Sequence, residues 1–225
     1  MTMGQPLKEL VLVGAGGTAA DVLSIIADIN RIAPTYQCIG LLDDNTAFRG
    51  KTRHTIPVLG AIEHAASLET AHFVDCMGSP GNYWKRPRIL QRLGVPLERF
   101  ETLIHPRASV SADCRIGRGT VIYPNVVIMA NVHIGNHVTV LANTVMNHDV
   151  EVGDLSIITS SVNISGGVSI GQNCYVGTGS ALKHGIRIGE RALIGMGSVV
   201  LRDVPSLTVV AGSPAVRLRS VDPES

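Results

Sequence analysis

Residues 133–153, HIGNHVTVLANTVMNHDVEVG, decide the fold of this chain. An aliphatic residue or methionine stands at every sixth position of this stretch, at Ile134, Val140, Met146 and Val152. A helix repeats its apolar positions near every 3.6 residues and a half-buried strand at every second residue, so neither explains a period of six. Hexapeptide repeats are typical of a parallel β-helix, in which each repeat lays down one short strand and one turn.

The same period extends far beyond this stretch. The series runs without interruption through Ile104, Val110, Ile116, Ile122, Ile128, Ile134, Val140, Met146, Val152, Ile158, Ile164, Ile170, Val176, Leu182, Ile188, Ile194 and Val200. Glycine follows every third member, at Gly117, Gly135, Gly153, Gly171 and Gly189, where it is expected to allow a tight corner. We therefore predict a left-handed parallel β-helix over residues 101–203, with three repeats to a coil and the series residues in its core.

The first 100 residues follow a different pattern, in which short apolar strands alternate with amphipathic helices. We expect strands near 9–13, 37–42 and 71–77 and helices near 19–31 and 83–93, with a shorter extended piece at 56–59 and a short helix at 62–68. This alternation is typical of a parallel sheet with helices on its faces. The prediction is thus a Rossmann-like α/β domain over 1–100, the β-helix, and a C-terminal tail over 204–225 that covers the end or side of the β-helix.

A glycine-rich loop joins the first predicted strand to the first predicted helix. Residues 14–19, GAGGTA, fit the G-x-G-x-x-A pattern, and Asp43 and Asp44 end the next strand. Such a loop can hold a nucleotide phosphate on backbone N–H groups and the helix N-terminus, with an acidic residue on the ribose or base. We predict substrate contacts at Gly14, Gly16, Gly17, Thr18, Asp43 and Asp44, and a further one at Gly78 after the third strand. The alternative is that both glycine clusters are ordinary turns.

Composition narrows the range of functions. The chain has 225 residues, 45% of them hydrophobic and 16% charged, with a net charge of +1. That charge gives no electrostatic case for binding nucleic acid or a membrane surface. Four scattered cysteines and the lack of a long early apolar run favour buried free thiols, no membrane span and a cytoplasmic location.

His148 is the strongest catalytic candidate in the sequence. It lies two residues after the core position Met146, at a predicted corner where its side chain points outward, and Asp149 follows it. A histidine paired with a carboxylate is the minimum equipment for general-base catalysis. The alternative is an exposed corner histidine with no catalytic role.

Two other histidine features carry less weight. His184 lies two coils further along the same edge, which places it about 10 Å from His148 at a strand spacing of about 4.8 Å. It either lines the same groove as His148 or has no functional role. His133 and His137 form an HxxxH pair, but a spacing of four does not align side chains on six-residue repeats. We therefore predict no metal site.

The chain as a whole resembles the sialic acid O-acetyltransferase/bacillosamine N-acetyltransferase type of hexapeptide-repeat sugar acyltransferase. Four segments match in order: 11–26 (VLVGAGGTAADVLSII), 40–45 with 56–60 (GLLDDN and IPVLG), 143–153 (NTVMNHDVEVG) and 194–214 (IGMGSVVLRDVPSLTVVAGSP). This chain has Thr18 where the loop of the family usually has a histidine, and Ile157 where many members have a second histidine. We expect different ligand contacts at the loop and a more apolar acceptor pocket.

The resemblance implies an acetyl-CoA-dependent N-acetyltransferase that acts on a nucleotide-linked amino sugar in bacterial surface-glycan biosynthesis. It implies a homotrimer with acetyl-CoA in the groove between neighbouring β-helices, His148 as the base, Asp149 as its orienting acid, and Asn147 near the substrate. No metal is implied. The expected acetyl-CoA contacts are Ile157, Gly166, Gly167, Lys183, Gly185, Gly195, Met196, Pro214 and Arg217.

Three alternatives remain open at this point. The acceptor could be a hydroxyl, as in sialic acid O-acetylation, since the same fold and base would serve. The glycine loop could bind NAD in an oxidoreductase, which would leave the long β-helix and His148 without a role. The chain could also be a non-catalytic trimeric scaffold.

Overall fold

The computed structural model describes residues 6–221, which form two compact units. The first unit comprises residues 6–77 and 88–103, and the second comprises 78–87 and 104–221. The stretch predicted as the N-terminal domain, 1–100, thus contains one segment, 78–87, that packs with the second unit. Within the described residues, no helix is long and apolar enough to cross a membrane.

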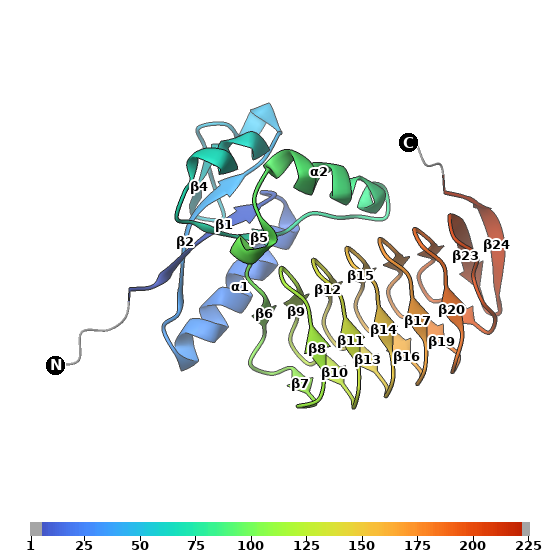
Figure 1. Cartoon of the computed structure of the whole chain (residues 1–225). Helices are drawn as coiled ribbons and strands as arrows, with labels where there is room; N and C mark the ends of the chain where they lie inside the picture. The colour runs from blue at the N-terminus through green and yellow to red at the C-terminus, as the bar shows by residue number, and fades with distance from the viewer. Residues whose placement is uncertain (1–5, 222–225) are drawn as a thin grey trace. The chain divides into compact units, whose positions relative to one another are not determined.

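The first unit is built on the predicted parallel sheet (Figure 1). Its strands lie in the order β3-β4-β2-β1-β5, with parallel pairing of β1 with β2 and β5 and of β2 with β4, while β3 runs antiparallel to β4. The elements are β1 (Lys8–Val13), α1 (Gly17–Ile32), β2 (Tyr36–Leu42), β3 (Thr52–Arg53), β4 (Ile56–Gly60), β5 (His72–Asp75) and α2 (Arg86–Leu93), with 3₁₀ turns at Thr46–Phe48, Ile62–Ser67, Tyr83–Lys85 and Leu97–Arg99.

The sequence pattern explains why these segments fold as they do. α1 buries Ala19, Val22, Ile25 and Ile26, which recur at helical spacing along one side. The last four residues of β1 are fully buried, as expected for an inner strand of a parallel sheet. The short helix predicted at 62–68 forms as a 3₁₀ turn, and the helix predicted over 83–93 begins with a 3₁₀ turn before it continues as α2.

The second unit is the predicted β-helix, with two-residue strands stacked on three faces (Figure 1). Face 1 consists of β6 (Leu103–Ile104), β9 (Val121–Ile122), β12 (Thr139–Val140), β15 (Ile157–Ile158), β18 (Tyr175–Val176), β21 (Leu193–Ile194), β23 (Thr208–Gly212) and β24 (Ala215–Ser220). Face 2 consists of β7 (Ser109–Val110), β10 (Val127–Ile128), β13 (Val145–Met146), β16 (Asn163–Ile164), β19 (Ala181–Leu182) and β22 (Val199–Val200). Face 3 consists of β8 (Arg115–Ile116), β11 (His133–Ile134), β14 (Glu151–Val152), β17 (Ser169–Ile170) and β20 (Arg187–Ile188).

The period of six places the core as expected. Every member of the series from Ile122 to Val200 is buried, while Ile104 at the first coil is 39% exposed. The strand pairs from β7 to β22 are parallel and in register at a spacing of 18 residues, as in Val127 with Val145. The prediction of a hexapeptide-repeat β-helix after an α/β domain is therefore confirmed.

The glycines that follow the core positions have a different role from the one predicted. None of the five has a positive φ; instead, a Cβ at Gly135 would lie 2.8 Å from the backbone nitrogen of Asp154 on the next coil. These glycines permit the coils to stack closely. The left-handed corner residues stand three positions after the core residue, as at Asn131 (φ 56°) and Asp149 (φ 60°).

Segment 78–87 packs against face 1 of the β-helix. The hydroxyl of Tyr83 donates to the carbonyl of Arg191 at 2.9 Å, and Arg86, 1% exposed, donates to the carbonyls of Leu155 and His137. The described part of the C-terminal tail extends the same face, because β23 pairs with β21 and β24 pairs with β23. Residues 222–225 of the predicted tail lie outside the described residues.

The four cysteines are free thiols, but only two are fully buried. Cys76 and Cys174 are buried, whereas Cys38 and Cys114 are partly exposed, contrary to the prediction for those two. Burial raises the pKa of the Cys38 thiol to about 11 and that of Cys174 to about 12. These two thiols are therefore protonated at neutral pH and are poor nucleophiles.

Candidate active site

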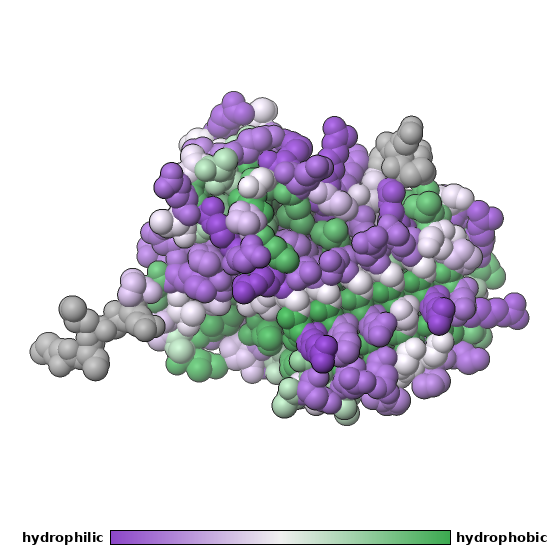
Figure 2. Space-filling view, viewed as in Figure 1, coloured by the Kyte–Doolittle hydropathy of each residue, from purple (hydrophilic) through white to green (hydrophobic). Residues whose placement is uncertain are grey.

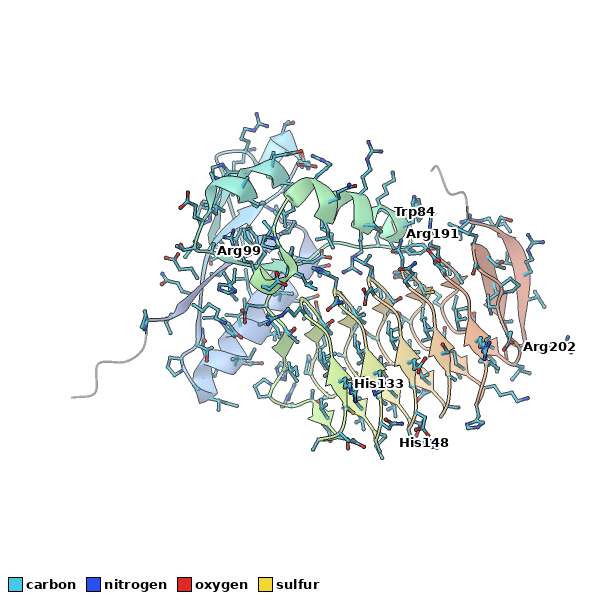
Figure 3. The ribbon with its side chains drawn as sticks, viewed as in Figure 1. Trp84, Arg99, His133, His148, Arg191 and Arg202 are labelled. Carbon is cyan, nitrogen blue, oxygen red and sulfur yellow. The ribbon has the colours of Figure 1, made fainter. Side chains whose placement is uncertain are left out.

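His148 and Asp149 form a hydrogen-bonded pair at a corner of the β-helix. The corner follows β13 on face 2 and leads into β14 on face 3, so its side chains project from the edge between these faces (Figure 3). The His148 side chain is 61% exposed, and its Nδ1 lies 2.7 Å from Oδ2 of Asp149. An ionised carboxylate only accepts hydrogen bonds, so Nδ1 carries the proton of the neutral ring and Nε2 keeps its lone pair.

The environment of Asp149 favours its charged form. Its Oδ1 accepts a hydrogen bond of 2.7 Å from Nδ2 of Asn131, which stands one coil earlier. The Asn131 amide first, and then His148, hold the pKa of the Asp149 carboxyl below its usual value. The pair thus sets an imidazole against an ionised carboxylate, which is the arrangement of a general base.

Asn131 is a site residue that the sequence analysis missed. The signal for it was present, because Asn131 precedes Asp149 by 18 residues, which is one coil of the β-helix. Asn147, predicted near the substrate, is exposed next to His148, and its side chain donates to the carbonyl of Ile164 at 3.0 Å, which ties two coils together.

Gly166 and His184 continue the edge beyond His148. A Cβ built on Gly166 would lie 2.6 Å from Cε1 and Nε2 of His148, so the glycine leaves the space that the imidazole occupies. The ring centroids of His148 and His184 are 6.3 Å apart, closer than the predicted 10 Å. The predicted distance was the separation of the two backbones, whereas the rings lean toward each other across the glycine.

Backbone bonds hold this edge from coil to coil. The N–H of Gly167 donates to the carbonyl of His148 at 2.9 Å, and the N–H of Gly185 donates to that of Gly166 at 3.0 Å. Gly167 and Gly185 have φ of 67° and 72°, a conformation that glycine adopts without steric cost. The side chain of Lys183 is exposed next to His184. The edge therefore brings Gly166, Gly167, Lys183 and Gly185 together with His148.

The other predicted acetyl-CoA contacts are not gathered around His148. Met196 is 78% exposed beside Gly195, whose added Cβ would meet Ala211 of β23 at 2.6 Å. Pro214 lies in the turn between β23 and β24, and Arg217 on β24 donates to the Ser220 hydroxyl at 3.0 Å.

Ile157 and Gly78 contact each other at a different face of the β-helix. Ile157 is 4% exposed on face 1, and a Cβ on Gly78 would lie 2.3 Å from its Cδ1. Within the described chain, Ile157 is thus covered by segment 78–87, and His148 projects from the opposite edge, between faces 2 and 3.

Of the two predicted acids, Asp43 holds the glycine loop of the first unit, and Asp44 is bonded elsewhere. Asp43 accepts from the N–H groups of Ala15 and Asn45, both at 2.8 Å, and Asp44 accepts from the N–H of Ile62 and pairs with Arg92 at 3.0 Å. Both carboxylates therefore have structural partners, which their positions in the sequence did not reveal.

The loop itself remains accessible. Gly16 and Gly17 are exposed, and a Cβ on either meets nothing within 4 Å. Helix α1 begins at Gly17 with no side-chain cap and no acidic residue in its first turn, which contains Thr18. The ring of His54, another residue that the sequence did not point to, lies 3.0 Å from the carbonyl of Gly16. The start of α1 thus presents backbone N–H groups that suit an anionic ligand.

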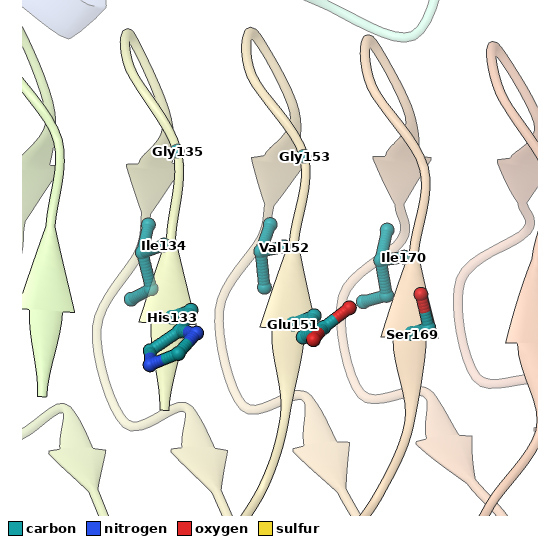
Figure 4. Close-up of a pocket in the computed structure, with 8 residues that line it drawn as sticks. All are labelled: His133, Ile134, Gly135, Glu151, Val152, Gly153, Ser169 and Ile170. Atoms are coloured by element: carbon teal, nitrogen blue, oxygen red, sulfur yellow. The ribbon is translucent and has the colours of Figure 1, made fainter. Parts of the chain in front are cut away.

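A shallow pocket lies on face 3, next to the His148 edge (Figure 4). Figure 2 shows an apolar band along the β-helix, bordered by hydrophilic residues. The pocket is lined by His133, Ile134, Gly135, Glu151, Val152, Gly153, Ser169 and Ile170.

Among residues 6–221, no group of three or more His, Cys, Asp or Glu side chains is placed to hold a metal ion.

Comparison with known proteins matches the two units to two family models. Residues 9–93 match the PglD N-terminal domain, and residues 100–201 match the GMPPB C-terminal domain. A curated relative, UDP-N-acetylbacillosamine N-acetyltransferase of Bacillus subtilis (strain 168), is 31% identical over 117 residues. The match spans 51% of this chain and 51% of that protein.

Solved structures resemble nearly the whole chain. The acetyltransferase domain of PglB from Neisseria gonorrhoeae FA1090, solved with acetyl coenzyme A, is 30% identical with a TM-score of 0.81, covering 95% of this chain and 100% of that one. PerB from Caulobacter crescentus, solved with CoA and GDP-perosamine, is 24% identical with a TM-score of 0.82, covering 95% and 99%. The likeness to PerB concerns the fold alone.

Proposed function

This chain belongs to the family of hexapeptide-repeat sugar acyltransferases that includes the PglB acetyltransferase domain, and from that premise we propose that it transfers the acetyl group of acetyl-CoA to the amino group of a nucleotide-linked amino sugar. The observation that carries the proposal is the exposed His148–Asp149 pair, with the proton on Nδ1 and the lone pair on Nε2. The names of the Bacillus and Neisseria relatives support acetyl transfer, and the former supports an amino acceptor.

The proposed mechanism is direct transfer with His148 as the base. Nε2 takes a proton from the acceptor amine as the nitrogen attacks the thioester carbonyl, and Asp149 stabilises the imidazolium that forms. A backbone N–H of the edge stabilises the negative charge that develops on the carbonyl oxygen. Coenzyme A leaves as the thiol, so the proton held by His148 returns to the leaving sulfur.

The His148 edge suits a thin, extended co-substrate such as the pantetheine arm of acetyl-CoA. Gly166 and Gly167 carry no side chain next to the His148 ring, and a Cβ at Gly166 would fill the space beside it. We propose that Gly166, Gly167, Lys183 and Gly185 line the arm. The remaining proposed contacts, toward the adenosine end, are Gly195, Met196, Pro214 and Arg217. Ile157 is 4% exposed under segment 78–87 and is not among the proposed contacts.

The first unit is the proposed holder of the nucleotide. The exposed glycines and the N–H groups at the start of α1 suit a diphosphate, and Thr18 adds a hydroxyl. Because Asp43 and Asp44 are already bonded to the loop and to Arg92, we propose that they shape this site and meet the ligand with their remaining lone pairs.

We propose that the enzyme works as a homotrimer. The outward strand residues of face 2 include Val127, Val145, Ala181 and Val199, and the next outward positions include Met129 and Leu201, 48% and 47% exposed. Such an apolar face favours burial against a neighbouring copy, and the neighbour would then stand beside the His148 edge. Light scattering that reports a monomer at micromolar concentration would overturn this assembly.

The substrate is tested by offering acetyl-CoA together with UDP-, GDP- and dTDP-linked amino sugars and measuring thiol release and product mass. The proposal expects acetylation of the amine for at least one of them and no turnover of the matching hydroxyl sugar. Transfer only to a hydroxyl, for example of sialic acid, would replace the acceptor class while keeping the base. Failure of every acceptor, with His148→Ala equally inert, would favour a non-catalytic scaffold.

A further inference from the structure

Asn131 is linked to the proposed base through Asp149. Its Nδ2 donates to Oδ1 of Asp149 at 2.7 Å, while Oδ2 of the same carboxylate accepts from Nδ1 of His148 at 2.7 Å. The carboxylate can only accept, so the Asn131 side chain must present its NH₂ group here. One oxygen of Asp149 is therefore assigned to Asn131 and the other to His148.

The backbone holds Asn131 firmly in place for this contact. Asn131 adopts the left-handed conformation with φ of 56°, which asparagine tolerates well, and its N–H donates to Oδ2 of Asp113 at 3.1 Å. The N–H of Asp149 in turn donates to the carbonyl of Ala130 at 3.1 Å. The two corners are thus stacked with their side chains in a fixed relation.

Asp149 needs such a partner because it is exposed. Its side chain is 55% exposed, so on its own it could rotate and offer its oxygens to water instead of to His148. The titratable groups near it are His148, Asp113 two coils earlier, and His184 beyond the His148 ring. The Asn131 amide is the foremost cause of the lowered pKa of the Asp149 carboxyl.

We propose that Asn131 is a positioning residue, which fixes the Asp149 carboxylate so that His148 keeps its proton on Nδ1 and its lone pair on Nε2. The expected effect of Asn131 on turnover rests on the proposed acetyl transfer. The expected effect of Asn131 on the tautomer of His148 does not depend on that function.

The chain offers a matched control at another edge of the β-helix. Asn125 is also a left-handed corner residue, with φ of 60°, and its Nδ2 donates to Oδ1 of Asn143 one coil later at 3.1 Å. Asn125 lies between β9 and β10, at the edge of faces 1 and 2. Asn125→Gly thus removes the same kind of bond from the same kind of corner without touching His148 or Asp149.

The experiment compares kcat and thermal midpoint for Asn131→Gly and Asn125→Gly in the full-length protein. Glycine accepts the left-handed corner, so neither variant suffers backbone strain. We expect Asn131→Gly to lower kcat about tenfold, as loss of an orienting partner of an active-site side chain does. Asn125→Gly should retain wild-type kcat, and the thermal midpoints of the two variants should agree.

A double-mutant cycle separates positioning from a structural role. If Asn131 acts through Asp149, Asn131→Gly should cause almost no further loss of kcat in an Asp149→Asn background. Equal losses in both backgrounds, or equal losses in the Asn125 and Asn131 variants, would overturn the inference.

NMR of the ¹⁵N-labelled His148 ring provides a readout without turnover. At a pH at which the ring is neutral, the wild-type His148 should carry its proton on Nδ1. Asn131→Gly should give a mixture of the Nδ1 and Nε2 tautomers, whereas Asn125→Gly should keep the wild-type tautomer. An unchanged tautomer in Asn131→Gly would sink the proposal even if the enzyme proves active. If His148→Ala retains full acetyl transfer, the assignment of His148 as the base fails, and this spectrum still decides whether Asn131 sets the tautomer of the ring.

Discussion

The His148 edge of the β-helix and the glycine loop of the first unit differ in what their polar side chains are bonded to. At the edge, His148 uses Nδ1 for Asp149 and projects 61% exposed into solvent. In the loop, Asp43 accepts from two backbone N–H groups and Asp44 is paired with Arg92. In the proposed function, side chains therefore carry the chemistry at the edge, whereas backbone donors carry recognition at the loop.

The largest expected effect is at His148 itself. His148→Ala should lower kcat about 10²–10⁴-fold, the usual contribution of a positioned base, with little change in either KM. Steady-state kinetics with acetyl-CoA and the accepted amino sugar measures this loss. Asp149→Asn should lose less, because the base survives and only its orientation and charge support are weakened.

His184→Ala is the matched control for this variant, since His184 stands on the same edge without an acid after it. It should keep most of the turnover. A dead His184→Ala beside an active His148→Ala would reverse the catalytic assignment.

Gly166→Ala should have the next largest effect. Its Cβ would lie 2.6 Å from the His148 ring, so the imidazole must move, and a displacement on this scale costs about 10–100-fold in kcat. Alanine itself suits this corner, because Ala130 occupies the equivalent position two coils earlier. The thermal midpoint should therefore stay close to wild type. If Gly166→Ala lowers kcat just as strongly in a His148→Ala background, the glycine does not act through the ring.

At the glycine loop, a smaller and different effect is expected. Gly16→Val fits the fold, since a Cβ there meets nothing within 4 Å and φ is −81°. The added methyl groups should obstruct the approach of a ligand to the start of α1 and raise the KM of the amino sugar about tenfold, equivalent to about 1.4 kcal/mol. The KM of acetyl-CoA should not change. An equal rise in both KM values would mean that the loop only supports folding.

The smallest effect on turnover, but a measurable one on stability, is expected from the loop acids. Asp43→Asn replaces an acceptor of a backbone N–H by a donor and should lower the free energy of unfolding by about 1–3 kcal/mol. Asp44→Asn should cost less, because its partner Arg92 is exposed. Urea denaturation measures both. Equal stability of Asp43→Asn and the wild type would show that the Ala15 contact does not hold the loop.

The sequence by itself determined the β-helix and the place of the proposed base, His148. A period of six is specific to this fold because each repeat must return its aliphatic residue to one shared core. Since Met146 is one of these core residues, His148, two positions later, must fall at an exposed corner. The strands and first helix of the α/β unit were predictable as well, since their apolar positions have the spacing of buried strands and of an amphipathic helix.

Only the tertiary structure decided which side chains meet. Contacts between coils join residues 18 apart, so the bond from Asn131 to Asp149 and the space that Gly166 leaves for His148 depend on how the coils stack. The partners of Asp43 and Asp44 depend on how the loop folds back on the sheet and on Arg92 from α2. The packing of segment 78–87 on face 1 likewise follows from Tyr83 and Arg86 finding carbonyl groups of the β-helix, which no local pattern in the sequence encodes.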